Sequence, residues 1–154
     1  MPYDLQNSLR PTDERAALEL DTARAIVAVS RQWRARFAER LRVAHHTETT
    51  YSALVCLADA PSGLKQSEPA AKIGITSGAL VRQLDVLEAR GLIVRSTIVG
   101  DRRAHLLLLT PAGRDATREL VGLAQAFRAT LFAHMDGASL TGLCRSLSAF
   151  SASA

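Results

Sequence analysis

The stretch that decides the fold is "TSGALVRQLDVLEARGLIVRSTIVGDRRAHLLLLTP", which runs from Thr76 to Pro111. Its first part predicts a helix with one apolar face, because leucines recur at helical spacing at Leu80, Leu84 and Leu87. Thr76 or Ser77 can cap the start of this helix through a side-chain oxygen. Gly91 can end it, since glycine readily adopts the left-handed conformation that follows a helix.

The second part of the stretch predicts a β-hairpin. Residues 92–98 and 104–109 are rich in β-branched residues and leucine, and a turn is expected at Gly100-Asp101 between them. The following Thr110-Pro111 pair predicts a new helix, with Thr110 as its cap and Pro111 at the first position, where the missing N–H costs nothing. A helix, a hairpin and another helix are thus expected in direct succession.

Two further helices are expected before this stretch. Residues 47–61 read as a helix capped by Thr47, and residues 64–74 as a short helix that Gly74 ends. The sequence does not decide between two starts of the short helix that differ by one turn. Lys65 stands at the capping position of the earlier start, and Pro69 fits only a first turn. The order of elements predicts a helix-turn-helix followed by a hairpin, which is a winged helix.

Long helices flank this region. Residues 12–44 read as one helix with Thr12 as its cap, and about 30 residues at 1.5 Å each span roughly 45 Å. A second long helix is expected from 111 to about 135, and a last one over about 140–150. Such lengths favour elements shared with a second subunit, and the expected dimer contacts include Leu18, Leu20, Phe150 and the C-terminal leucines.

The net charge of +4 is concentrated in the middle of the chain. Residues 1–60 hold eight arginines and eight acids, and residues 115–154 hold three of each. Residues 61–114 hold eight lysines and arginines against four acids, so they carry the whole excess. Such segregation is typical of a protein that binds a polyanion.

Other features of the sequence narrow the classes of protein. No apolar run approaches the roughly 18 to 20 residues of a membrane span, and the N-terminus lacks the order of a signal peptide, so a cytoplasmic location is expected. Cys56 and Cys144 are expected to be free thiols. There is no phosphate-binding glycine loop, no HExxH motif and no paired nucleophile and base, so no enzyme is expected. No cofactor is expected either.

Three segments of the chain resemble the MarR family of bacterial winged-helix transcription regulators, and within it the SlyA-type branch. The resemblance is carried by "KIGITSGALVRQLDVLEARGLIVR", by "DRRA" and by "LLLLTPAGR". It implies a mainly α fold with a small two- to three-stranded β wing. It also implies one MarR-type domain over 1–154, with the winged helix-turn-helix lobe at 47–110 and dimerisation helices at 12–44 and 111–154.

The helix after Thr76 is the expected recognition helix. Small residues at its start allow close approach to the major groove, Val81 can contact a thymine methyl group, and Arg82 can reach guanine or phosphate. Asp85 is expected to orient Arg82 or another arginine. The residues expected to contact DNA from this helix are Thr76, Ser77, Gly78, Val81 and Arg82.

The wing supplies the remaining expected DNA contacts. The resemblance implies that Arg103 enters the minor groove and that Asp101 fixes its geometry by an ion pair. Arg102 and Arg95 are expected to contact phosphates. Because one winged helix covers one half-site, a homodimer should read a pseudo-palindromic stretch of double-stranded DNA.

The resemblance further implies a small aromatic or phenolic effector. Its tentative pocket is lined by Trp33, Phe37, His45, His46 and Tyr51. The ligand spacing for a metal site is lacking, and Cys56 beside leucines predicts an inert buried thiol rather than a redox sensor. The competing hypothesis is a winged-helix adaptor that binds only proteins, which would favour a neutral or apolar recognition face.

Overall fold

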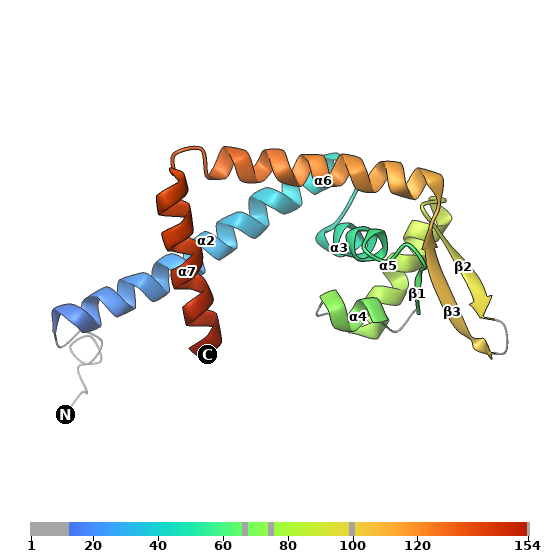
Figure 1. Ribbon diagram of the computed structural model, residues 1–154, viewed down its shortest axis with the longest axis horizontal. Helices are drawn as coiled ribbons and strands as arrows, with labels where there is room; N and C mark the ends of the chain where they lie inside the picture. The colour runs from blue at the N-terminus through green and yellow to red at the C-terminus, as the bar shows by residue number, and fades with distance from the viewer. Residues whose placement is uncertain (1–12, 66–67, 74–75, 99–100, 154) are drawn as a thin grey trace, which may run out of the picture. The chain divides into compact units, whose positions relative to one another are not determined.

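The computed structural model of the chain describes residues 13–65, 68–73, 76–98 and 101–153 (Figure 1). The helices are α2 (Glu14–Val43), α3 (Glu48–Ala58), α4 (Glu68–Ile73), α5 (Ser77–Ala89), α6 (Pro111–Leu131) and α7 (Gly137–Ser153). The strands are β1 (Leu64–Lys65), β2 (Ile93–Ile98) and β3 (Asp101–Leu109). The chain forms two units, with their boundary inside α2 between Glu39 and Arg40. The predicted fold class, mainly α with a small β wing, is confirmed.

The wing is an antiparallel sheet with the strand order β1-β3-β2. Leu64 of β1 pairs with Leu107, and Ile93 of β2 pairs with Leu109. Near the tip, Ile98 pairs with Asp101 after a register shift, so Asp101 begins β3 rather than occupying the turn that the sequence predicted. Gly100, the other residue of that turn, lies outside the described residues.

The predicted helix over 64–74 is wrong at its start. Leu64 and Lys65 form β1 because their backbone groups pair with β3, and α4 begins only at Glu68. Lys65 therefore does not cap the helix; instead its N–H donates to Glu68 Oε2 over 2.6 Å. Pro69 is fully buried at the second position of α4, where a missing N–H breaks no helical hydrogen bond.

The outer helices differ from the prediction at their ends. The predicted cap of the first helix, Thr12, lies outside the described residues, and Asp13 performs this role, since its Oδ1 accepts from the Ala16 N–H over 2.7 Å. The helix α6 ends at Leu131, earlier than predicted, and α7 extends beyond the predicted span at both ends. The predicted cap Thr110 is confirmed, because its Oγ1 accepts from the Gly113 N–H.

The core of the second unit lies where α3, α4 and α5 pack together beside the sheet and under the first half of α6 (Figure 1). Its side chains come from every one of these elements. The most buried include Leu54, Leu57, Leu64, Leu80, Leu84, Leu87, Ile93, Leu107 and Leu120. The predicted winged helix-turn-helix is therefore present, with α5 directly followed by the wing. No helix in the described part of the chain has the length and apolar character to cross a membrane.

Candidate DNA-binding surface

The helix α5 has one buried and one exposed face. Its predicted apolar stripe is confirmed, with Leu80, Leu84 and Leu87 at most 1% exposed. Thr76 is the cap, and its Oγ1 accepts from the Ala79 N–H. The opposite face presents the exposed residues Gly78, Val81, Arg82 and Asp85.

The exposed face of α5 leaves room for a partner. A Cβ added to Gly78 would meet no described residue beyond its own helix turn within 4 Å, so packing among these residues does not require its small size. Val81 is 37% exposed although it is apolar. The side chain of Ser77, a predicted contact, lies outside the described structure. A face of small residues around a long cation suits insertion into a groove.

Arg95 joins the wing to the recognition helix. Its guanidinium binds Asp85 Oδ1 at 2.6 Å and forms a second ion pair with Glu88, while its backbone N–H donates to Glu88 Oε1 at 3.3 Å. The side chain is only 19% exposed. Arg95 is thus paired with two carboxylates of α5, and the phosphate contact expected of it stays a prediction. The expectation that Asp85 pairs with an arginine is met by Arg95.

The C-terminal end of α5 is fixed by a Schellman motif. The Leu92 N–H donates to Leu87 O, and the Gly91 N–H donates to Glu88 O. Gly91 has φ +69°, a conformation that glycine adopts without strain. The wing therefore leaves α5 in a fixed direction. Thr110 Oγ1 reinforces this corner by donating to Gly91 O over 2.7 Å.

His45 and His46 belong to a structural junction between the start of α3 and the end of α5. The Arg90 guanidinium donates to His45 O over 2.8 Å and contacts His46 Nε2 at 3.1 Å. Because arginine only donates, His46 Nε2 accepts, and the neutral ring carries its proton on Nδ1, which faces Thr50 Oγ1 at 3.3 Å. His46 is 7% exposed and His45 has φ +58°. His46 thus takes part in this junction, and its place in a ligand pocket stays a prediction.

Burial lowers the pKa of His46 below its usual value, and the positive charges of Arg90 and His45 lower it further. The unfolded chain therefore binds a proton at this position at a higher pH than the folded chain does. As the pH falls from above 7 toward 5, the unfolded state gains protons first, so the free energy of unfolding decreases. The stability that a neutral His46 provides is fully present only above the pKa of the unfolded residue, about 6.5.

We expect the wild-type melting temperature to be lower at pH 5.5 than at pH 7.5, and His46→Gln to reduce this difference. Glutamine can keep the hydrogen bonds to Thr50 and Arg90 but cannot be protonated. Thermal unfolding followed by circular dichroism measures the effect, with the exposed His134 changed in His134→Gln as the control. An equal pH difference in wild type and His46→Gln would contradict the assignment.

The wing tip carries the other predicted contacts. Asp101, Arg102 and Arg103 are the first three residues of β3, and their backbone positions place them at the end of the hairpin far from α6 (Figure 1). Their side chains lie outside the described structure, so the predicted ion pair between Asp101 and Arg103 stays a prediction. The bulge between Thr97 and Ile98 lies next to this tip.

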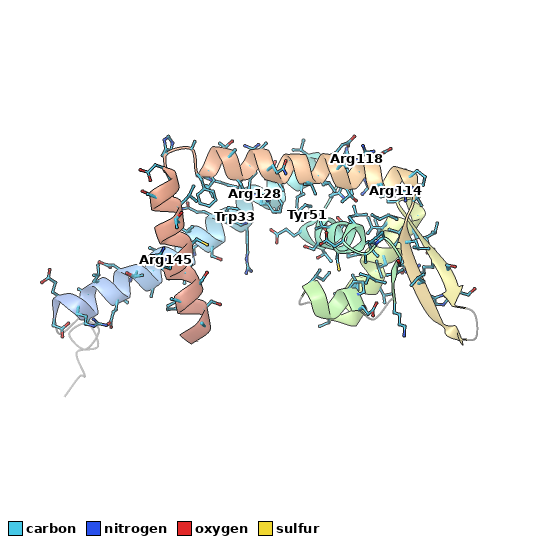
Figure 2. All side chains as sticks on the ribbon, in the orientation of Figure 1. Trp33, Tyr51, Arg114, Arg118, Arg128 and Arg145 are labelled. Atoms are coloured by element: carbon cyan, nitrogen blue, oxygen red, sulfur yellow. The ribbon has the colours of Figure 1, made fainter. Side chains whose placement is uncertain are left out.

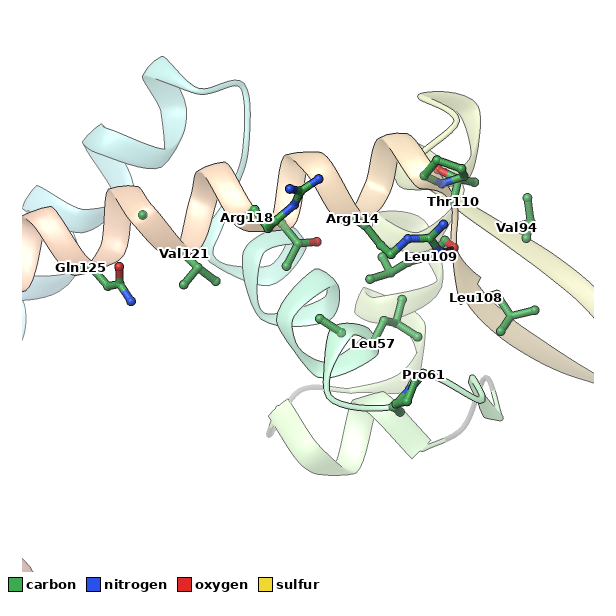
Figure 3. A pocket seen from close by; sticks show the side chains of 15 residues that line it. Leu57, Pro61, Val94, Leu108, Leu109, Thr110, Arg114, Arg118, Val121 and Gln125 are labelled. Atoms are coloured by element: carbon green, nitrogen blue, oxygen red, sulfur yellow. Dashed lines mark hydrogen bonds between the residues drawn. The ribbon is translucent and has the colours of Figure 1, made fainter.

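A hollow of about 980 Å³, which was not expected from the sequence, lies between the end of α3, the wing and α6. None of the five residues predicted for the ligand pocket lines it. Figure 2 shows Arg114 and Arg118, which do line it, on the half of α6 next to the sheet, whereas Arg128 lies on the other half. The sequence signal that could have indicated this hollow is the spacing of Arg114 and Arg118 by four residues (Figure 3).

The described residues contain no group of three or more histidine, cysteine or acidic side chains that could hold a metal ion. Cys56 is half-buried and Cys144 is exposed, both as free thiols.

Trp33 and Phe37 are half-buried on α2, and Tyr51 is half-buried on α3. Tyr51, the one predicted pocket residue that lies on α3, does not line the hollow beside α6.

A capped helix with an exposed face of small residues and arginine, followed at once by an antiparallel wing, is a winged helix-turn-helix, an arrangement that many DNA-binding proteins use. Residues 46–105 match the model of the MarR family. The match covers the helix-turn-helix and most of the wing, and over this region the chain is similar to the MarR family.

Several solved structures share the fold. The transcriptional repressor CouR bound to a 23-mer DNA duplex is 29% identical, with a TM-score of 0.73 over 82% of this chain and 89% of that one. CouR from Rhodococcus jostii RHA1 bound to p-coumaroyl-CoA is 22% identical, with a TM-score of 0.68 over 82% and 88%. The MarR family regulator AbsC from Streptomyces coelicolor is 21% identical, with a TM-score of 0.76 over 92% and 95%.

Proposed function

We propose that this protein is a sequence-specific regulator that inserts α5 into the major groove of its operator. The observation that carries the proposal is the exposed face of α5, where Arg82 has no hydrogen bond or ion pair to the described residues while Arg95 is fully engaged. Arg82 is therefore available for guanine or phosphate. The repressor CouR, to which the chain is similar, was solved on a DNA duplex, which supports the same partner here.

Each residue of the proposed surface has a role that follows from its position. Thr76 and Ser77 lie at the positive end of α5, where backbone N–H groups attract a phosphate. Gly78 permits close approach of the helix, and Val81 offers an apolar contact to a thymine methyl group. At the wing, Arg102 contacts phosphate and Arg103 enters the minor groove, where a narrow A·T tract concentrates negative potential.

A homodimer follows from the outer helices. None of the described residues of α7 is buried, and Leu143, Leu147 and Phe150 are 39%, 45% and 61% exposed. In α2 only Leu41 is buried, and Leu18 is 69% exposed. Helices with apolar side chains in solvent are normally covered by another element. A second copy of the chain would cover them and bring a second α5 to the other half of a pseudo-palindromic operator.

We propose, further, that a small molecule tunes the affinity for DNA and that the protein acts in the cytoplasm. CouR from Rhodococcus jostii RHA1, which has a similar fold, was solved with p-coumaroyl-CoA, which supports an effector here. On this proposal 1–154 is one MarR-type domain, with its DNA-binding lobe at 47–110 and dimerisation helices at 12–44 and 111–154. The aromatic side chains of Trp33 and Phe37 stay candidates for a pocket that forms in the dimer.

Arg103→Ala tests the proposal. We expect it to weaken binding to an operator selected from random DNA by about tenfold, because one charged contact in the minor groove is lost. Gel-shift titration measures the affinity. Arg128→Ala, which removes the same charge from α6, should leave the affinity within about twofold, and light scattering should give the mass of two chains for all three proteins.

Two outcomes would contradict the proposal. If Arg103→Ala binds the operator as tightly as wild type does, the wing tip is not part of the DNA interface. Wild-type protein that shows no salt-dependent DNA binding would instead favour the adaptor hypothesis, because a DNA-binding protein loses affinity linearly in log salt as it releases counterions.

A further inference from the structure

The exposed face of α5 carries a carboxylate in line with the residues proposed to meet DNA. Asp85 lies three residues after Arg82 and four after Val81, so these side chains share one stripe of the helix. The side chain of Asp85 is 57% exposed. A carboxylate that approaches phosphates is repelled unless a cation balances its charge. Asp85 therefore needs such a cation if this stripe is to enter a groove of DNA.

Arg95 is the cation that balances Asp85. It lies on β2, and its Nη2 donates to Asp85 Oδ1 over 2.6 Å (Figure 1). Because the Arg95 side chain is mostly buried, its guanidinium has little freedom to leave this pair. The wing thus holds a carboxylate of α5 in a fixed direction and offsets its charge.

Arg95 uses the oxygens of its two carboxylate partners differently. Glu88 gives both oxygens, since Oε1 accepts from the Arg95 backbone N–H over 3.3 Å and Oε2 pairs with the guanidinium. Asp85 gives only Oδ1, and its Oδ2 forms no hydrogen bond or ion pair with a residue that the structure describes. Asp85 Oδ2 is therefore an oriented acceptor on the exposed stripe.

An oriented acceptor distinguishes between bases in the major groove. A carboxylate accepts from the N4 amino group of cytosine, whereas thymine presents the acceptor O4 and guanine presents O6 and N7. We infer that Asp85 reads one cytosine in each half of the operator through Oδ2, while Arg95 holds the carboxylate through Oδ1. The inference rests on the proposed function, because it requires α5 to lie in the major groove. It gives Asp85 two roles, one toward the wing and one toward a base.

Selection of bound DNA from a random pool tests the inference on the full-length protein. We expect wild type to select a C·G pair at one position of each half-site that Asp85→Asn no longer selects. On duplexes that differ only at this pair, replacing C·G with T·A should weaken wild type about tenfold, since an acceptor then faces the carboxylate. Asparagine can donate as well as accept, so the same replacement should change the affinity of Asp85→Asn by at most about twofold.

Glu88→Gln is the matched control, because it alters the other carboxylate that binds Arg95. Both oxygens of Glu88 face Arg95, so this variant should bind all duplexes more weakly by the same factor and keep the tenfold preference for cytosine. Thermal unfolding verifies that both variants are folded.

An altered base gives a second measurement. A duplex with 2-pyrimidinone in place of the cytosine lacks only the amino group that Asp85 would contact. Wild type should bind this duplex at least about fivefold more weakly than the cytosine duplex, and Asp85→Ala should bind the two within about twofold.

The outcomes separate the inference from the proposed function. If Asp85→Asn weakens all duplexes equally, as Glu88→Gln should, Asp85 serves only to hold Arg95 and the inference is overturned. An equal loss on 2-pyrimidinone in wild type and Asp85→Ala overturns it as well. In both cases specific binding by wild type leaves the proposed function intact. Wild type that selects no sequence at all would overturn the proposed function instead.

Discussion

Replacing Gly113 with alanine should lower the free energy of unfolding by about 3 kcal/mol, in the range of severe overpacking. Gly113 lies in the first turn of α6 and is buried. It packs against Leu92, the residue that follows Gly91. A Cβ at this position would lie 1.9 Å from Leu92 O and 2.9 Å from Leu92 C. Since both are backbone atoms, α6 and the root of the wing would have to move apart.

The matched control is Gly122→Ala on the same helix. A Cβ at Gly122 meets no atom within 4 Å, so alanine should raise stability by up to about 1 kcal/mol through its higher helix propensity. Urea unfolding of both variants measures the two free energies. If Gly113→Ala were as stable as wild type, the close packing of α6 on Leu92 would be contradicted.

Replacing Arg95 with methionine should weaken operator binding by about thirtyfold, roughly 2 kcal/mol, and also lower stability. Methionine retains the apolar stem but leaves the carboxylates of Asp85 and Glu88 without their shared partner. These carboxylates lie on or beside the face of α5 that approaches DNA, where they would repel phosphates. The wing would also lose its tie to α5.

A positioning role and a phosphate contact for Arg95 predict opposite results in a matched set of variants. If Arg95 positions the wing, Asp85→Asn combined with Glu88→Gln should restore part of the affinity of Arg95→Met, and the salt dependence of binding should keep its slope. If Arg95 binds phosphate, the slope should fall by about 0.9 for the lost contact. Gel-shift titrations at several salt concentrations separate the two roles.

The sequence predicts most of the winged helix because its signals are local. The cap at Thr76, the leucine stripe of α5 and the left-handed Gly91 each depend on residues within one or two turns, and the structure has all three. The cap at Thr110 is of the same kind. Local hydrogen bonds and periodic burial decide such features before distant parts of the chain meet.

The features that the sequence did not predict depend on distant partners. The strand β1 has two residues and exists because Leu64 meets Leu107, 43 positions later. The role of Arg95 depends on the register that brings β2 beside α5. The hollow requires three elements in their final positions, and no single segment carries its pattern. The contact of His46 Nε2 with Arg90, 44 positions away, likewise depends on the folded arrangement of α3 and α5.

The way α5 is anchored has a consequence for how the regulator can change over time. Arg90 fixes its end, Arg95 holds its middle to the wing, and the leucines bury its inner face, while Gly78, Val81 and Arg82 contribute nothing to this support. On the proposed function, and leaving Asp85 aside, the residues that support the fold and the residues that read the operator are thus separate sets on one helix. A lineage can therefore acquire new operators through substitutions on the outer face while the scaffold stays intact.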